Sequence, residues 1–238
     1  MRITISGIVL ALIFAVPSAA QNSVKRNDRP PETASPAPER REDNQKPADR
    51  TRYSYEFKQP EFLITHIVIE HDAAGHGKIS FERKGEETPI DEPVELSATA
   101  LARILVLWKD LRFLDSSENY QSPKNFAHLG IYWIGMDDGK RKRTAEFNWS
   151  NNKSAWGLAM EYRHVADQAI LIFNLNVARE LQPLNVPELL NEVEILLTRN
   201  ELSDPKQLVP LLTELRTDEH IPLIARNHAD RLLKKIGK

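Results

Sequence analysis

The stretch that decides the fold is residues 129–149, LGIYWIGMDDGKRKRTAEFNW. Its two halves flank Asp138-Gly139, a pair favoured in type I′ turns because both central positions need positive φ. The pattern therefore predicts a β-hairpin with Leu129–Met136 and Arg141–Trp149 as its strands. One face is the more apolar, and we expect it to pack on the core; it holds Tyr132, Ile134, Ala145 and Phe147.

The other face of this hairpin contains the candidate binding residues. Trp133 lies there between polar neighbours, where an indole ring can stack on a sugar or fill a pocket of a partner, although burial under another segment is equally compatible with the sequence. Lys142 belongs to the basic run Lys140–Arg143, which either meets an anionic partner or keeps an exposed strand edge unpaired. We name Trp133 and Lys142 as candidate partner-binding residues.

Upstream, Phe62–Glu70 is rich in β-branched residues and predicts a strand. A loop with two glycines follows, and Lys78–Arg83 alternates again, so the two segments form a second hairpin. Thr88–Leu96 predicts an edge strand, because Pro89 and Pro93 have no N–H group to donate to a central ladder.

Two amphipathic helices are expected, one after each hairpin. Ser97 is a typical N-cap, and an apolar face with helical spacing follows it, consisting of Leu101, Ile104, Leu105, Trp108 and Leu111. Ser154 begins a longer helix that reaches about Leu181. Within it, Ala169–Phe173 is apolar all the way round, which is typical of a helix buried on more than one side. We expect this helix to join the sheet and the C-terminal helices in one continuous core.

The C-terminal segment, residues 182–238, is predicted to be all helical. Pro187, Pro205 and Pro222 each stand where a helix begins, a position that suits proline because the first helical N–H has no partner. An apolar stripe follows each proline. The segment resembles HEAT-type helical repeats in residues 204–212 and 224–233, and the resemblance implies a helical cap rather than a full solenoid.

The order strand, strand, helix, strand, strand, helix over residues 59–181 predicts an α+β domain of antiparallel hairpins packed on helices. This domain resembles emfourin, a bacterial metalloprotease inhibitor, in the glycine-containing first hairpin, the Leu96-Ser97 helix start and the Leu111-x-Phe113-Leu114 ending. The resemblance implies binding to another protein. It assigns no binding residue to this chain.

The N-terminal part predicts export. Residues 1–20 have the pattern of a signal peptide, with Arg2 before an apolar run and small residues at the cleavage site, which places the protein in the periplasm or outside the cell. Residues 21–58 are rich in proline and mixed charges and predict a disordered linker. No later stretch is apolar enough to predict a membrane span.

Composition limits the chemistry. The chain of 238 residues has no cysteine, which excludes disulfides and thiolate chemistry, and its formal net charge of −2 does not favour a nucleic-acid partner. No motif predicts a cofactor. His71, Asp72 and His76 form a candidate metal-binding loop.

We therefore expect a non-catalytic exported protein that binds another envelope or extracellular protein. The alternative is a hydrolase of polysaccharide or peptide using dispersed carboxylates, with Glu70, Asp72 and Glu146 as the candidates.

Overall fold

A computed structural model describes residues 50–237, so the predicted signal peptide and residues 21–49 of the predicted linker lie outside the described residues. The elements in chain order are β1 (Arg52–Lys58), β2 (Ile64–Asp72), β3 (His76–Arg83), β4 (Ile90–Glu95), α1 (Ala98–Leu111), η2 (Phe113–Asp115), η3 (Ala127–Leu129), β5 (Ile131–Asp137), β6 (Lys142–Phe147), α2 (Lys153–Leu181), η4 (Pro183–Asn185), α3 (Val186–Arg199), η5 (Pro205–Leu208), α4 (Val209–Thr217) and α5 (Leu223–Ile236), where η denotes a short 3₁₀ helix.

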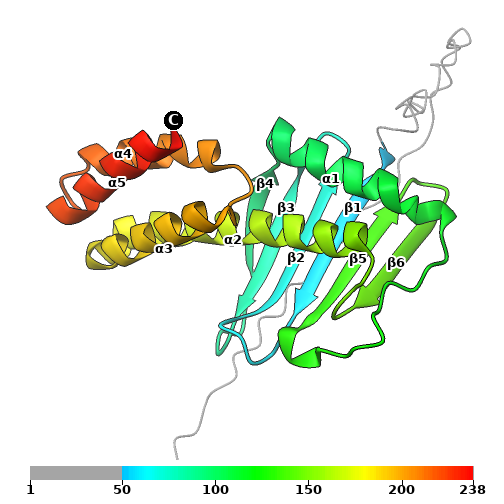
Figure 1. Cartoon of the computed structure of the whole chain (residues 1–238). Helices are drawn as coiled ribbons and strands as arrows, with labels where there is room; N and C mark the ends of the chain where they lie inside the picture. The colour runs from blue at the N-terminus through cyan, green and yellow to red at the C-terminus, as the bar shows by residue number, and fades with distance from the viewer. Residues whose placement is uncertain (1–49, 238) are drawn as a thin grey trace, which may run out of the picture. The chain divides into compact units, whose positions relative to one another are not determined.

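The six strands form one sheet in the order β4-β3-β2-β1-β5-β6, and every neighbouring pair is antiparallel. Helices α1 and α2 lie side by side on one face of this sheet (Figure 1). Helices α3, α4 and α5 follow α2 in the chain and pack on its C-terminal half and on one another. The predicted α+β class with a helical C-terminal part is confirmed.

Strand β1 corrects the predicted linker. The linker was expected to end at residue 58 and the domain to start at residue 59, but Arg52–Lys58 is a central strand paired with both β2 and β5. Its alternating aromatic side chains supply the reason, because Tyr55 and Phe57 are completely buried in the sheet core. Burial of two large aromatic rings offsets the entropy of ordering this short segment.

The β5–β6 hairpin has the predicted faces but not the predicted turn. Tyr132 pairs with Phe147 and Ile134 with Ala145, so all four lie on the face toward the helices. The loop spans residues 138–141 and is closed by the Asp138 N–H, which donates to the Arg141 carbonyl over 3.1 Å. The expected two-residue Asp138-Gly139 turn is therefore wrong. The pairing shifts by two residues, which leaves every side chain on its predicted face.

The two long helices begin close to where the sequence predicts. Ser97 is the N-cap of α1, and its hydroxyl accepts from the Ala100 N–H over 3.2 Å. The N-cap of α2 is Asn152 and not Ser154, since the Asn152 side chain accepts from the Ser154 and Ala155 N–H groups. Asparagine is at least as good an N-cap as serine, so the helix begins directly after the earlier of the two residues.

Helix α2 joins two hydrophobic cores. Its first part, up to Ile170, packs in the core between the sheet and α1, whereas Leu171, Leu175 and Ala178 belong to a second core formed with α3, α4 and α5. The prediction that Ala169–Phe173 is buried on more than one side is confirmed. The expected single continuous core is wrong. Neighbouring residues on opposite sides of α2 face different cores, one formed with the sheet and α1 and the other with α3, α4 and α5.

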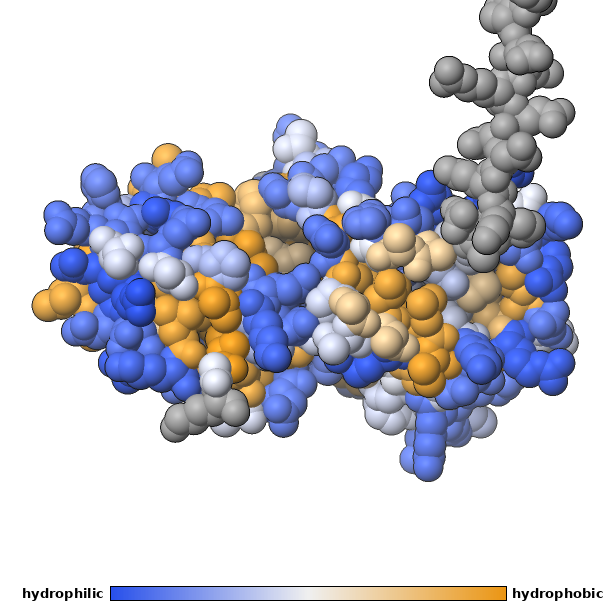
Figure 2. All heavy atoms as spheres, turned by 90° about the horizontal axis from the view of Figure 1, so that it is seen from above, coloured by the Kyte–Doolittle hydropathy of each residue, from blue (hydrophilic) through white to orange (hydrophobic). Residues whose placement is uncertain are grey.

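All three predicted proline starts lie at helix starts in the structure. Pro187 lies in the first turn of α3 and Pro222 is the N-cap of α5. Pro205 begins the 3₁₀ helix η5, which runs directly into α4, with Pro210 in the first turn of α4. Within residues 50–237 no helix is both long and apolar enough to cross a bilayer. Apolar surface gathers in separate patches over the sheet-containing part and the C-terminal helices (Figure 2).

Candidate functional site

The face of the sheet that points away from α1 and α2 is the main candidate surface, and we call it the open face. No helix of the described residues covers it (Figure 1). The strand registers show which charged residues lie on the open face, and acidic residues outnumber basic ones there. The acidic residues are Glu56, Glu70, Asp72, Glu82, Asp91, Glu95, Asp137 and Glu146. The basic residues are Arg52, Lys58, Lys78 and Lys142. An antiparallel sheet with one solvated face typically shows such alternation.

The structure brings Trp133 and Lys142 onto this same face. Trp133 pairs with Glu146 and Lys142 with Asp137, and the Gly135–Thr144 pair lies between these two rows. A hollow of about 320 Å³ opens there, lined by both Lys142 and Gly135. A Cβ on Gly135 would meet the Ser54 hydroxyl, so a larger residue here would require the Ser54 side chain to rotate away. Lys142 thus lines the depression, whereas Trp133 lies two residues from Gly135 along β5 and is not part of its lining.

Trp133 is held in a fixed orientation. Its indole Nε1 donates to Glu146 Oε2 over 2.8 Å, and the ring is partly exposed on the open face. Because the N–H group is already satisfied, the ring can offer its apolar face to a partner without losing a hydrogen bond. Lys142 is exposed and forms no ion pair within residues 50–237.

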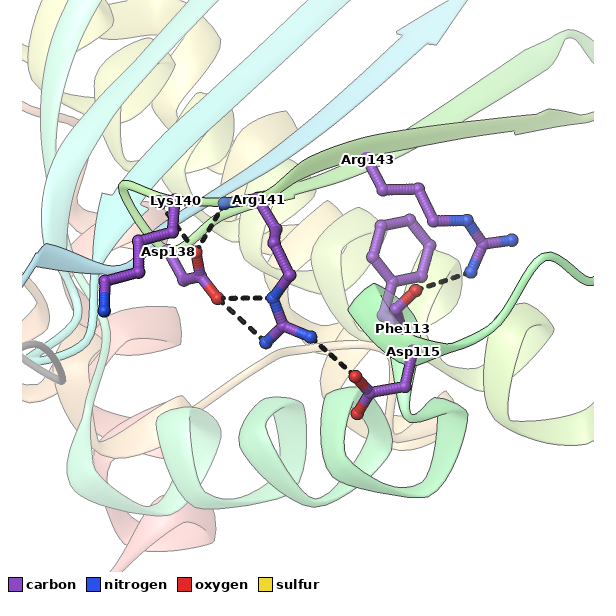
Figure 3. Close-up of polar contacts among 6 residues, drawn as sticks. All are labelled: Phe113, Asp115, Asp138, Lys140, Arg141 and Arg143. Atoms are coloured by element: carbon purple, nitrogen blue, oxygen red, sulfur yellow. Dashed lines mark hydrogen bonds and ion pairs between the residues drawn. The ribbon is translucent and has the colours of Figure 1, made fainter.

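The basic run Lys140–Arg143 is divided by the structure into structural and exposed members (Figure 3). Arg141 donates to Asp138 and, over 2.6 Å, to Asp115 Oδ1 in η2. Arg143 donates to the Phe113 carbonyl over 2.7 Å and lies over the Phe113 ring with its guanidinium carbon 4.4 Å from the ring centroid. Both arginines therefore hold the hairpin to the chain after α1, while Lys140 points away from these contacts.

Asp138 is the most strongly shifted acid of this hairpin. The backbone N–H groups of Arg141 and Lys140 donate to its carboxylate, and the Arg141 guanidinium adds further hydrogen bonds, which together lower its pKa to about 2. Hydrogen bonds to the charged form of a carboxyl favour ionisation. The Asp138 carboxylate therefore stabilises the turn, because the groups that donate to it belong to residues of the same turn.

A second feature of the open face is a row of three polar residues that crosses β1, β2 and β3. His66 Nε2 lies 2.9 Å from Glu56 Oε1, and His66 Nδ1 lies 3.0 Å from Glu82 Oε1. Both contacts are hydrogen bonds only when the ring carries two protons or one of the carboxyl groups is protonated. Glu56 is also the cross-strand neighbour of Trp133, so this row continues the candidate surface.

No protein-family model matches this chain, and no curated protein is similar to it at a significant level. The site is therefore defined by its geometry. The His66 row could not have been found from sequence, since it depends on the registers of β1, β2 and β3. The only signal in the sequence for this row was the regular alternation of polar residues along each strand.

The candidate metal loop does not converge. His71 is buried on the helix side of the sheet, where its Nε2 lies 2.7 Å from the Tyr162 hydroxyl. Asp72 and His76 lie on the open side, with His76 Nδ1 4.0 Å from Asp72 Oδ1. Burial alone would raise the pKa of Asp72, but N–H groups of His76 and Ala74 outweigh it, and the pKa is lowered. Within residues 50–237 no group of three or more such side chains is arranged to hold a metal ion.

Of the three carboxylates of the hydrolase alternative, Glu70 and Asp72 are neighbours on one face of β2, and Glu146 is separated from both. Glu70 and Asp72 lie on β2 and Glu146 on β6, with β1 and β5 between them. Three strand spacings correspond to about 14 Å, whereas the paired carboxyls of glycosidases stand roughly 5 to 9.5 Å apart. Glu146 is moreover bonded to Trp133.

Proposed function

We propose that this chain is a non-catalytic binding protein that contacts a partner protein through the open face of its sheet. The observation that carries the proposal is the presence of Trp133 and Lys142 on the same open face, with Lys142 lining the Gly135 hollow and Trp133 two residues along β5 from Gly135. A partly exposed tryptophan is typical of the residues that dominate binding energy in protein interfaces. Charged groups around it supply selectivity and orientation.

The compartment in this proposal is the periplasm or the extracellular space, and it rests on the signal-peptide pattern of residues 1–20. The acidic excess of the open face supports a protein partner over a nucleic acid, because a polyanion is repelled by such a surface.

Site-specific photo-crosslinking tests the proposal. A photoreactive amino acid replaces Trp133 or Lys142 in cells that export the protein, and adducts are identified by mass spectrometry. Replacement of Lys109, an exposed residue of α1 on the other side of the sheet, is the matched control. We expect one partner to be captured from both open-face positions and not from position 109.

Binding by purified components gives the second readout. Trp133→Ala and Lys142→Glu should each weaken the affinity for the captured partner, the former by about 2 kcal/mol or roughly 30-fold in Kd. Lys109→Glu should leave the affinity unchanged. Failure of positions 133 and 142 to form any adduct, or equal capture from position 109, would overturn the proposal.

A further inference from the structure

A second concavity lies away from the open face, where α2 passes from one core to the other. It has a volume of about 360 Å³ and is bounded by β4, the middle of α2 and η5. We call it the α2–β4 groove. Its floor is apolar and includes Val94, Leu96, Ala169, Ile172 and Phe173. Val94 and Leu96 are buried, while the three α2 residues are partly exposed and available for contact.

A chain of hydrogen bonds fixes the wall of this groove. The buried Gln168 donates through Nε2 to Gln207 Oε1 over 2.9 Å and accepts from the Asp204 N–H over 2.9 Å. Gln207 Nε2 in turn donates to the Glu95 carbonyl over 2.9 Å. These bonds tie β4 to α2 and η5. The groove is therefore preformed, which lowers the entropic cost of filling it.

The charged side chains that line the groove from its own side of the sheet are Glu92 and Glu180, and no basic residue of the described part of the chain lines it. Glu95 contributes its backbone, because its side chain lies on the open face. The Arg83 guanidinium lies over the Phe173 ring, 5.6 Å from its centroid, and its charge is paired with Glu86 over 3.6 Å. The closest ionic neighbour of Glu95 is His76 Nε2 at 3.8 Å, on the open side. Glu92 and Glu180 form no ion pair within residues 50–237. An apolar floor with an unbalanced acidic rim favours an occupant that is both apolar and cationic.

The backbone of β4 does not offer a template for an additional strand. The Leu96 N–H donates to the Gly75 carbonyl, so by antiparallel alternation Ile90, Glu92 and Val94 bond toward β3. Pro93 then faces outward with no N–H group, and the outward Glu95 carbonyl is taken by Gln207. An occupant of the groove is consequently held by its side chains and not by strand pairing.

We propose that the α2–β4 groove binds a segment of a partner protein in which an apolar side chain is flanked by Lys or Arg. The apolar side chain enters over Ile172 and Phe173, and the basic groups meet Glu92 and Glu180. Residues 21–49 of this chain contain basic residues, but Val24 is their only aliphatic residue larger than alanine apart from proline, so they match the floor poorly. The groove is separate from the Gly135 hollow and does not depend on the function proposed above.

Fluorescence polarisation with the purified chain and three labelled synthetic peptides tests this proposal. The first peptide alternates Leu and Lys, the second replaces Lys by Glu, and the third replaces Leu by Ser while keeping every Lys. We expect saturable binding of the first peptide alone. Equal binding of the first and third peptides, or no saturable binding of the first up to about 1 mM, would overturn the proposal.

Variants of the chain locate the binding. Glu92→Lys combined with Glu180→Lys should raise the Kd of the Leu/Lys peptide about tenfold, since two attractions at the groove become repulsions. Glu219→Lys combined with Asp110→Lys, two exposed reversals away from the groove, is the charge-matched control and should change the Kd little. Circular dichroism confirms that each variant is folded.

Two further results are decisive. Backbone amide shifts in NMR spectra should change on peptide addition at Ile172 and Val177 and not at Trp133. Trp133→Ala should bind the peptide with unchanged affinity. Loss of peptide binding in Trp133→Ala, or an unchanged Kd in the double reversal variant, places the peptide elsewhere and contradicts the proposal.

Discussion

Tyr162 connects three aromatic residues inside the sheet core. Its hydroxyl lies 2.7 Å from His71 Nε2 and accepts from Trp108 Nε1 over 3.1 Å. His71 Nδ1 lies 2.7 Å from the Asp72 carbonyl and therefore carries the proton, so Nε2 accepts from the Tyr162 hydroxyl. Tyr53 stacks on the His71 ring with 5.1 Å between centroids. The polar side-chain atoms of His71, Tyr162 and Trp108 all have partners, and these three residues join β2, α2 and α1.

Removal of the Tyr162 hydroxyl tests the energetic contribution of this network. Tyr162→Phe leaves both His71 Nε2 and Trp108 Nε1 without a partner in the core, so the free energy of unfolding should fall by about 1–3 kcal/mol. Urea unfolding followed by fluorescence measures it. Tyr53→Phe is the matched control, because that hydroxyl has no hydrogen-bond partner within residues 50–237; an equal loss in both variants would argue against the network.

The same network makes stability depend on pH. Burial lowers the pKa of His71 below the ordinary value of 6.5, and the opposing effects of Asp72 are smaller. The unfolded chain therefore takes up this proton first, so the stabilisation is complete above about pH 6.5 and is lost as the pH falls through the folded-state pKa. Unfolding free energies measured from pH 8 to pH 5 should decline below 6.5.

The histidine responsible can be identified directly. His71→Asn should flatten the decline, whereas His220→Asn, at a fully exposed position, should preserve it. An NMR titration of the wild-type His71 ring gives its folded pKa without any substitution. A titration midpoint at or above 6.5 is inconsistent with this account.

At the scale of elements, the β5–β6 hairpin is attached to the end of α1 by its arginines. Arg143 donates to the carbonyls of Phe113 and Glu118 and contacts the Phe113 and Tyr120 rings. Arg143→Met should therefore lower the free energy of unfolding by about 1–3 kcal/mol, because two carbonyls lose a charged donor. Lys142→Met, one residue away on the open face, should be nearly neutral. Thermal and urea unfolding of the two variants show whether Arg143 stabilises the fold by attaching the hairpin to the chain after α1 or only by its positive charge.

The elements best predicted from the sequence are those whose signal is local. The apolar spacing after Ser97 gave α1, and the alternation around Gly139 gave the faces of β5 and β6. Strand β1 was missed although Tyr53, Tyr55 and Phe57 alternate with polar residues, because it directly follows a long proline-rich stretch of mixed charge. Its central place in the sheet comes from pairing with β2 and β5, which no local pattern encodes.

The candidate site was only partly accessible to sequence reasoning. Strand periodicity places Trp133 and Lys142 on a polar face, but the hollow beside Lys142 also involves β1 and β2, since Arg52, Ser54 and Glu70 line it. The roles of Arg141 and Arg143 depend on a contact with η2, about thirty residues earlier in the chain. Such long-range contacts follow from the fold and have no signature in the run Lys140–Arg143 itself.

At the scale of the whole described molecule, two cores share one helix. Leu158 is fully buried in the sheet core and Leu212 in the helical core, and α2 passes through both. Arg103 in α1 also donates to the Ser203 carbonyl over 2.7 Å, which links the two sides. Because α2 cannot lose one half of its packing without weakening the other, we expect residues 50–237 to unfold cooperatively.

Core truncations test this coupling. Leu158→Ala and Leu212→Ala should each destabilise by about 2–5 kcal/mol and shift one common transition. Calorimetry and urea unfolding monitored by circular dichroism and tryptophan fluorescence should give coincident curves. Two transitions, with Leu212→Ala moving only one, would show that the helical part is an independent folding unit.

The blocked edge of β4 affects how copies of this molecule can associate at high concentration. Pro93 and the occupied Glu95 carbonyl interrupt one margin of the sheet, and the segment after α1 contacts β6 at the other through Arg143. An open sheet edge can pair with a strand of another copy and so promotes aggregation. We therefore expect strand addition between copies to be disfavoured at β4, even at high local concentration.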